Sequence, residues 1–178
     1  ATRTESIPAT GDKPCDGGDT CPGIIFTDMP PKGDWAHDAI DWAVVTGITN
    51  GTGATTFSPN QGCTRGQVVT FLWRAAGSPE PSKTDNPFKD VKEGAFYYKA
   101  VLWAVENGIT NGTGATTFSP NETCTRAQIV TFLWRYKGSP EPKNNVSPFT
   151  DVTGGYYKAV LWAVENKVTN GTSADKFD

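Results

Sequence analysis

The sequence predicts a mainly α-helical protein made of tandem helix–loop–helix repeats, and two kinds of observation lead to this fold class. The stretch TNGTGATTFSPN occurs at 49–60 and again, letter for letter, at 110–121. The segment CTRGQVVTFLWR at 63–74 returns as CTRAQIVTFLWR at 124–135, with the same offset of 61 residues. Within these copies apolar residues recur every three or four positions, and Gly and Pro separate them, which is typical of short helices joined by turns.

A short starting motif sets the limits of the repeats. F-x-D occurs at Phe26, Phe88 and Phe149, and a helix-like segment ending in T-N-G-T follows each copy. The third copy reaches Asp178 before a second C-T-R segment begins. We therefore divide the chain into a head with linker (1–25), repeat 1 (26–87), repeat 2 (88–148) and the first half of repeat 3 (149–178).

The first helix of repeat 1 is expected to begin after Asp34, a good N-cap residue. Ile40 and Val44 mark its apolar face, and Gly47 ends it, as Gly108 does in repeat 2. The loop that follows contains Phe57 or Phe118, which we expect to anchor the loop on the core.

The second helix begins with a Thr that has a Gln three residues later, at Thr64 and Gln67 and again at Thr125 and Gln128. This spacing predicts a capping box, in which each side chain bonds the backbone amide of the other residue. Gly-Ser-Pro-Glu-Pro at 77–81 and 138–142 then ends the helix and connects it to the next repeat.

Helix pairs this short cannot bury both faces alone, so the repeats are expected to pack on one another. Five of the six tryptophans occupy equivalent positions and are assigned to this packing: Trp42, Trp103, Trp162, Trp73 and Trp134. Trp35 breaks the pattern, and we interpret it as a surface aromatic available to a ligand.

Composition excludes several function classes. A net charge of −3 argues against a nucleic-acid binder that uses a general basic field. No apolar run approaches the ~20 residues that span a bilayer. The single histidine, His37, leaves little room for Ser-His-Asp or His-metal chemistry. A glycosidase using Asp28 or Asp90 with Glu93 is disfavoured because these carboxylates recur once per repeat, as structural residues do. We therefore expect no enzyme.

The repeat resembles the S-layer homology (SLH) domain of bacterial cell-surface proteins. The resemblance lies in F-x-D at each repeat start, the A-V-containing first helix, N-G-T with F-S-P-N in the loop, and the T-R-A-E-like start of the second helix. It implies a pseudo-threefold bundle of three prongs, each built from helices. It also implies a non-catalytic role in holding a protein on the cell wall, by binding peptidoglycan-linked secondary cell-wall polysaccharide that often carries pyruvate ketals. Gln67 and Gln128 depart from the Glu of T-R-A-E, and Gly66 replaces Ala in repeat 1.

The residues themselves favour an acidic ligand. Arg65 and Arg126 fall in the first turn of their helices, where the helix dipole disfavours a cation and the free backbone amides attract anions. An arginine fork beside those amides suits a carboxylate such as that of a pyruvylated sugar. The alternative is that each arginine pairs with an aspartate of a neighbouring repeat and fixes the contact between prongs. The full set of candidate ligand-binding residues is Arg65, Arg126, Gln67, Gln128, Thr64, Thr125, Asp28, Asp90, Asp151, Trp35, Asn50, Gly51, Asn111 and Gly112.

The Asn-Gly pairs in that set allow close backbone approach to sugar hydroxyls, although Asn-Gly also forms turns without any ligand. The four cysteines are assigned as a Cys15–Cys21 disulfide and two buried free thiols, Cys63 and Cys124, which we place on different prongs. We expect no metal and no cofactor. Three aspartates near the Cys loop hint at calcium without the spacing of an EF-hand, so we interpret the loop as solvated: Asp12, Asp16 and Asp19.

Two functions remain open after this reading. The first is a carbohydrate-binding anchor that attaches a surface protein to the bacterial cell wall, outside the cell. The second is an assembly module, in which self-association or a partner chain completes the unfinished third repeat.

Overall fold

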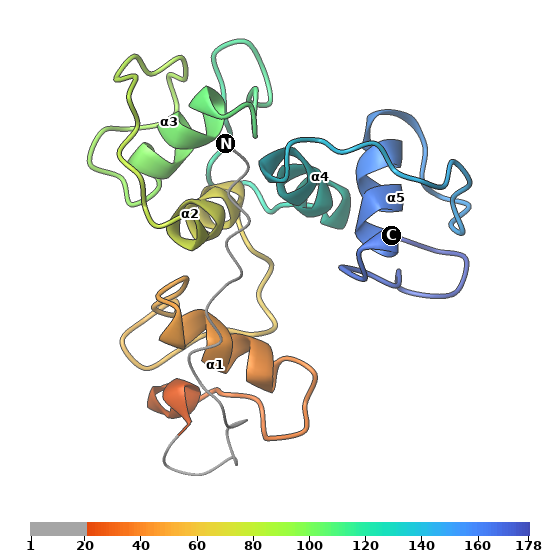
Figure 1. Cartoon of the computed structure of the whole chain (residues 1–178). Coiled ribbons are helices and arrows are strands. Elements are labelled where there is room, and N and C mark those ends of the chain that lie inside the picture. Colours follow the sequence, from red (N-terminus) through yellow and green to blue (C-terminus); the bar gives the residue numbers. More distant parts are fainter. Residues whose placement is uncertain (1–20) are drawn as a thin grey trace. The chain divides into compact units, whose positions relative to one another are not determined.

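The computed structural model describes residues 21–178, and this part of the chain is mainly helical (Figure 1). The α-helices are α1 (His37–Val45), α2 (Arg65–Ala75), α3 (Tyr98–Glu106), α4 (Arg126–Tyr136) and α5 (Tyr157–Glu165), with 3₁₀ turns η1 (Pro22–Ile25) and η2 (Gly154–Tyr156). Over residues 21–178 β-pairing is limited to isolated bridges. The predicted mainly α class is therefore confirmed, whereas the pseudo-threefold arrangement stays a prediction.

The chain divides into two compact units, residues 1–61 and 62–178. In the second unit, helices pair across the repeat boundaries. α2 of repeat 1 packs on α3 of repeat 2, and α4 of repeat 2 packs on α5 of repeat 3. Val69, Val101 and Phe118 lie in the core around the first pair, and Val130 and Val160 in the core around the second. The unit of packing is therefore the second helix of one repeat with the first helix of the next.

Gly66 explains how repeat 2 approaches α2 so closely. A Cβ at this position would lie 2.9 Å from the ring of Tyr97 and 3.1 Å from the carbonyl oxygen of Pro120. The departure from Ala noted in the sequence therefore makes room for repeat 2 and leaves the capping box intact.

In the first unit, α1 packs on η1 over a small core of Phe26, Ala36 and Ile40. Trp42 keeps 43% of its surface exposed, whereas Trp103 and Trp162 at the equivalent positions keep 6% and 8%. The predicted burial is thus wrong for Trp42, because the short turn η1 is the helical neighbour of α1 in this unit.

The positions of the other tryptophans are explained by contacts close to them in the chain. Trp73 and Trp134 are half-buried, and each indole N–H donates to a carbonyl of the proline connector, at Pro79 and Pro140, over 2.8 Å. Trp35 is 90% exposed, in keeping with its interpretation as a surface aromatic.

The helix ends agree with the sequence in part. Gly47 and Gly108 adopt φ of 71° and 68° just after α1 and α3, so both act as the predicted stops. Lys167 takes this left-handed conformation after α5, with φ of 57°. Asp34 is not the N-cap of α1, however. Its carboxylate accepts a hydrogen bond from the Ala36 amide (2.9 Å), forming a turn ahead of the helix.

Within residues 21–178, no helix has the length and hydrophobicity that a bilayer crossing requires. The linker, Cys15 and the aspartates considered for calcium lie outside the described residues.

Candidate ligand site at the helix starts

The second helix of each complete repeat begins with the predicted capping box. Thr64 Oγ1 accepts a hydrogen bond from the Gln67 amide (3.3 Å), and Gln67 Oε1 accepts one from the Thr64 amide (2.8 Å). Thr125 and Gln128 repeat both bonds at the start of α4, at 3.2 Å each. These four candidate side chains therefore hold the helix starts, and the side-chain amide nitrogens of the glutamines take no part in the capping bonds.

Arg65 is the first residue of α2 and is buried against the loop of repeat 2. Its exposed fraction is 4%, and its Nε donates to the Phe118 carbonyl oxygen over 2.8 Å. The guanidinium carbon lies 4.8 and 5.3 Å from the ring centres of Phe118 and Phe132. Burial lowers the pKa of Arg65, yet an arginine stays charged in proteins. Arg65 therefore forms part of the contact between repeats 1 and 2.

Arg126 contacts repeat 3 in the same way but is exposed. Its Nε donates to the Phe177 carbonyl oxygen and its Nη2 to Thr169 Oγ1, both over 3.1 Å. The guanidinium carbon lies 5.2 Å from the centre of the Phe177 ring. Within residues 21–178, Phe132 adds a second ring over Arg65, whereas one ring, that of Phe177, lies at Arg126. The two arginines differ in solvent access although their local sequences are nearly the same.

The backbone amides at the start of α2 already have acceptors. The Arg65 amide donates to the Glu122 carbonyl and the Gly66 amide to the Pro120 carbonyl, each over 2.9 Å. We expected these amides to be free to attract an anion; instead, the loop of repeat 2 occupies them. An anion site at α4 therefore has to be argued from the Arg126 side chain.

The three F-x-D aspartates hold the loops of their own repeats. Each carboxylate accepts hydrogen bonds from two successive backbone amides over 2.7 to 3.2 Å. The pairs are Asp28 with Phe57 and Ser58, Asp90 with Phe118 and Ser119, and Asp151 with Phe177 and Asp178. Over residues 21–178, neither arginine of the candidate site forms an ion pair with any of these carboxylates. The arginines bind loop carbonyls, and the aspartates bind loop amides.

The Asn-Gly turns are fixed by close packing. Gly112 has φ of 85°, and a Cβ there would lie 2.4 Å from the Thr117 carbonyl oxygen and 2.5 Å from the Phe88 ring. Gly51 meets the same obstacles in repeat 1. The turn therefore requires glycine without any ligand, while Asn50 and Asn111 remain exposed to solvent. The loop phenylalanines act as the predicted anchors, because Phe57, Phe118 and Phe177 each pack on the Phe of their F-x-D motif with ring centres 5.7 Å apart.

Cys63 and Cys124 are free thiols, as predicted, but only Cys124 is buried, while Cys63 is partly exposed. The Cys124 amide donates to the Cys63 carbonyl over 2.8 Å, next to an antiparallel bridge between Thr64 and Thr123. The prediction that the two cysteines do not pair is confirmed, although a backbone bridge joins the starts of α2 and α4 beside them. Burial raises the pKa of Cys124 to about 11 and also raises the pKa of Cys63. Cys21 is disulfide-bonded, and its assigned partner, Cys15, lies outside the described residues.

The loop carboxylates give a testable dependence on pH. Hydrogen bonds from the Phe57 and Ser58 amides lower the pKa of Asp28, and those from Phe177 and Asp178 lower that of Asp151. A lowered pKa in the folded state stabilises the fold above the unfolded value of 3.8, and this stability is lost as the pH falls through the folded pKa. We expect the melting temperature to fall as the pH is lowered below about 4.

The variant Asp28→Asn tests this dependence by thermal unfolding, followed by circular dichroism, at several pH values. It should melt earlier at neutral pH and lose less of its melting temperature on acidification. Asp85→Asn, at an exposed position, should behave like the parent chain. Equal acid losses in Asp28→Asn and the parent would contradict the assignment.

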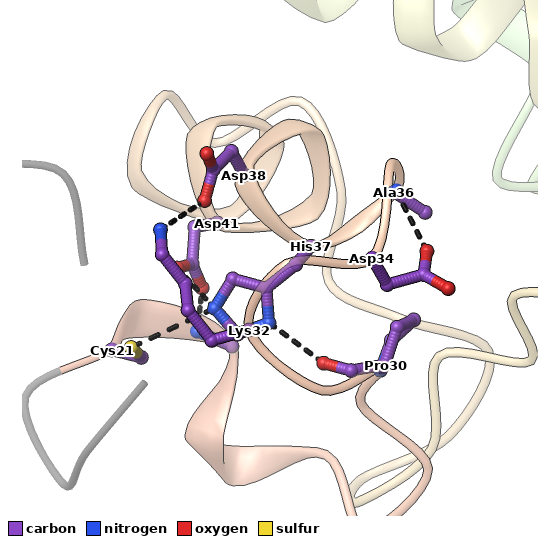
Figure 2. Close-up of polar contacts among 9 residues, drawn as sticks. Cys21, Pro30, Lys32, Asp34, Ala36, His37, Asp38 and Asp41 are labelled. Atoms are coloured by element: carbon purple, nitrogen blue, oxygen red, sulfur yellow. Dashed lines mark hydrogen bonds and ion pairs between the residues drawn. The ribbon is translucent and has the colours of Figure 1, made fainter. Parts of the chain in front are cut away.

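One cluster was missed in the sequence. In the first unit, Cys21, His37 and Asp41 are buried and converge, as Figure 2 shows. The signal was present, because His37 and Asp41 break the repeat where α3 and α5 share one sequence, YKAVLWAVE.

The regions that match known proteins coincide with the repeats. The model of the S-layer homology domain matches residues 25–69, 87–130 and 148–178. The chain is 39% identical over 110 residues to an endoglucanase of Bacillus sp. (strain KSM-635), covering 62% of this chain and 11% of the endoglucanase. It is 32% identical over 147 residues to the surface-layer 125 kDa protein of Lysinibacillus sphaericus, covering 79% of this chain and 12% of that protein.

A cell surface protein of Thermoanaerobacter kivui is 32% identical over 117 residues, covering 64% of this chain and 15% of that protein. The chain thus spans only a small part of the length of the relatives it matches. The chain belongs to the S-layer homology domain family, a family of non-catalytic modules that anchor S-layer and other cell-surface proteins to the cell wall.

Proposed function

We propose that this chain attaches a surface protein non-covalently by binding an acidic secondary cell-wall polysaccharide, with Arg126 as the residue that receives the acid group. The observation that carries the proposal is the fixed geometry of the Arg126 guanidinium at the start of α4, where the side chain is exposed within residues 21–178. Phe177 and Thr169 hold its guanidinium in place. A held guanidinium loses little entropy on binding and presents two parallel donors to a carboxylate.

The neighbourhood of Arg126 suits a sugar as well as an acid. Thr125 is exposed. The capping box uses the side-chain oxygen of Gln128, so its side-chain nitrogen can serve as a further donor. Arg65 is an unsuitable receptor because it is buried under Phe118 and Phe132. The ligand class that fits is therefore a polysaccharide with carboxylates, such as pyruvylated sugars.

Binding of the full chain to purified wall polysaccharide tests the proposal. Arg126→Ala should lower the affinity about tenfold or more, because it removes a charge-assisted pair of hydrogen bonds, and should leave the melting temperature nearly unchanged. Arg126→Lys should recover only part of the affinity, since lysine keeps the charge without the fork. Lys143→Ala removes another exposed positive charge and should bind normally.

The polymer provides a second arm of the same experiment. Polysaccharide from which pyruvate has been removed should bind the parent chain as weakly as the intact polymer binds Arg126→Ala. Equal binding of both polymers would exclude the carboxylate. A large fall in melting temperature with intact binding would make Arg126 a structural residue.

A second candidate function is assembly through α1. Trp42 and Val45 on this helix are 43% and 50% exposed, although α3 and α5 bury the equivalent tryptophans against α2 and α4. A helix equivalent to α2, from a partner chain or a second copy, would cover them. If the chain self-associates, its molecular mass in solution should rise with concentration, and Trp42→Lys should remove this rise. A monomer at all concentrations would exclude self-association.

A further inference from the structure

The first unit contains a buried polar cluster that the other repeats lack. His37 and Asp41 lie one turn apart on α1 and are 4% and 6% exposed. The equivalent positions are Tyr98 and Leu102 in α3, and the same residue types occur in α5. Packing alone is therefore served by Tyr and Leu. Burying an aspartate instead carries a large desolvation cost, which a specific partner has to offset.

Two distances in the cluster, both from His37 Nε2, are close to those of a metal site. His37 Nε2 lies 3.4 Å from Asp41 Oδ2 and 3.8 Å from Cys21 Sγ, and the three ligand atoms all lie within 4.8 Å of one another (Figure 2). In a tetrahedral zinc site, nitrogen and oxygen ligands are about 3.4 Å apart and nitrogen and sulfur ligands about 3.6 Å apart, given the usual bond lengths.

One carboxylate oxygen of Asp41 has His37 Nε2 as a neighbour but forms no hydrogen bond in the described part of the chain. The Asp41 side chain is nine-tenths buried. Its Oδ2 nevertheless accepts no hydrogen bond within residues 21–178. Its other oxygen, Oδ1, accepts a hydrogen bond from the Gly23 amide over 2.7 Å, which fixes the carboxylate with Oδ2 toward His37. A Cβ on Gly23 would lie 2.9 Å from Oδ1, so glycine permits this approach.

The imidazole is oriented in the way that metal-binding histidines are. Nδ1 lies 2.7 Å from the Pro30 carbonyl oxygen, which only accepts hydrogen bonds, so Nδ1 carries a proton and donates it. The other ring nitrogen, Nε2, faces Asp41 and Cys21. A backbone carbonyl that fixes the tautomer in this way is the usual outer partner of a zinc-bound histidine.

We propose that Cys21, His37 and Asp41 form a zinc site that exists when Cys21 is a thiol and is closed when Cys21 is in its disulfide. Reduction by a phosphine breaks the S–S bond, converts each sulfur to a thiol, and yields the phosphine oxide with oxygen from water. Zn²⁺ then displaces the Cys21 thiol proton to solvent and binds the thiolate, Nε2 and Oδ2. The fourth position is taken by water.

The experiment titrates Zn²⁺ into the full chain before and after treatment with a water-soluble phosphine, using calorimetry. Co²⁺ serves as a second probe, since a cobalt–thiolate bond gives a visible absorption band. The reduced chain should bind one Zn²⁺ per molecule at least about tenfold more tightly than the oxidised chain, because the oxidised chain lacks the thiolate.

The other repeats supply the matched variants. Asp41→Leu and His37→Tyr install the residues that α3 and α5 carry, so they are expected to fold, which circular dichroism checks. Each should lose tight Zn²⁺ binding in the reduced chain. Normal binding by either variant would place the metal on other thiols, such as Cys63 or Cys124, and would overturn the proposal. Equal affinity of the oxidised and reduced chains would overturn it as well. Polysaccharide binding, which rests on Arg126, is not expected to change in these variants.

Discussion

Replacing Arg65 by alanine is expected to lower the free energy of unfolding of the second unit by about 3 kcal/mol. The variant leaves the Phe118 carbonyl without its donor, which costs about 1–3 kcal/mol for a buried group. It also removes the guanidinium from the rings of Phe118 and Phe132, worth about 0.5–2 kcal/mol. Urea unfolding followed by circular dichroism measures the loss.

Arg126→Ala is the matched control, because Arg126 makes equivalent contacts while exposed. We expect it to cost less than about 1 kcal/mol, since water replaces the lost donors. If the two alanine variants lose the same stability, the burial of Arg65 is not what distinguishes these arginines. If Arg65→Ala also abolishes polysaccharide binding in a folded chain, Arg65 has to be added to the receptor site.

Gly112→Ala is expected to cost about 3 kcal/mol or more, or to prevent the second unit from folding. A Cβ there would lie 2.4 Å from the Thr117 carbonyl oxygen and 2.5 Å from the Phe88 ring. Neither obstacle can move aside easily. The Thr117 oxygen belongs to the backbone, and the Phe88 ring is packed in the core with 4% of its surface exposed. The loop therefore has to move away from its anchor, which exposes Phe118 as well.

Gly138→Ala separates the clash from the backbone conformation. Gly138 has the same φ of 85° as Gly112, but nothing lies within 4 Å of its added Cβ. It should lose only about 1–2 kcal/mol, the cost of an L-residue in the left-handed region. Thermal unfolding of both variants gives the comparison. Equal losses would mean that the turn is held by its φ angle and not by packing on Phe88.

The features that the sequence predicted well depend on neighbours within a few residues. The capping boxes at Thr64 and Thr125 involve residues three apart, so their geometry follows once a helix forms. The stop at Gly47 is likewise local. Asp34 shows the limit of such reasoning, because an aspartate near a helix start can bond an amide in the preceding turn instead of capping the helix.

The features that escaped prediction depend on residues far apart in the chain. Arg65 and Arg126 have nearly the same local sequence and both contact the loop of the following repeat, but Phe132 of α4 also covers Arg65. Cys63 and Cys124 were correctly predicted to be free thiols, but their proximity was not predicted. A backbone bridge joins the two helix starts.

The sequence by itself determined the repeat, the helical class and the family, because a fixed period with helical spacing leaves few alternatives. The tertiary structure decided which charged groups face solvent and which bind other parts of the chain and stabilise the fold. The loop aspartates bind backbone amides, Arg65 is covered by the next repeat, and Arg126 is exposed. It also brought Cys21 to His37 and Asp41, a contact between a head residue and α1. Burial and electrostatic environment are properties of the packed chain, so copies of one motif can take different roles.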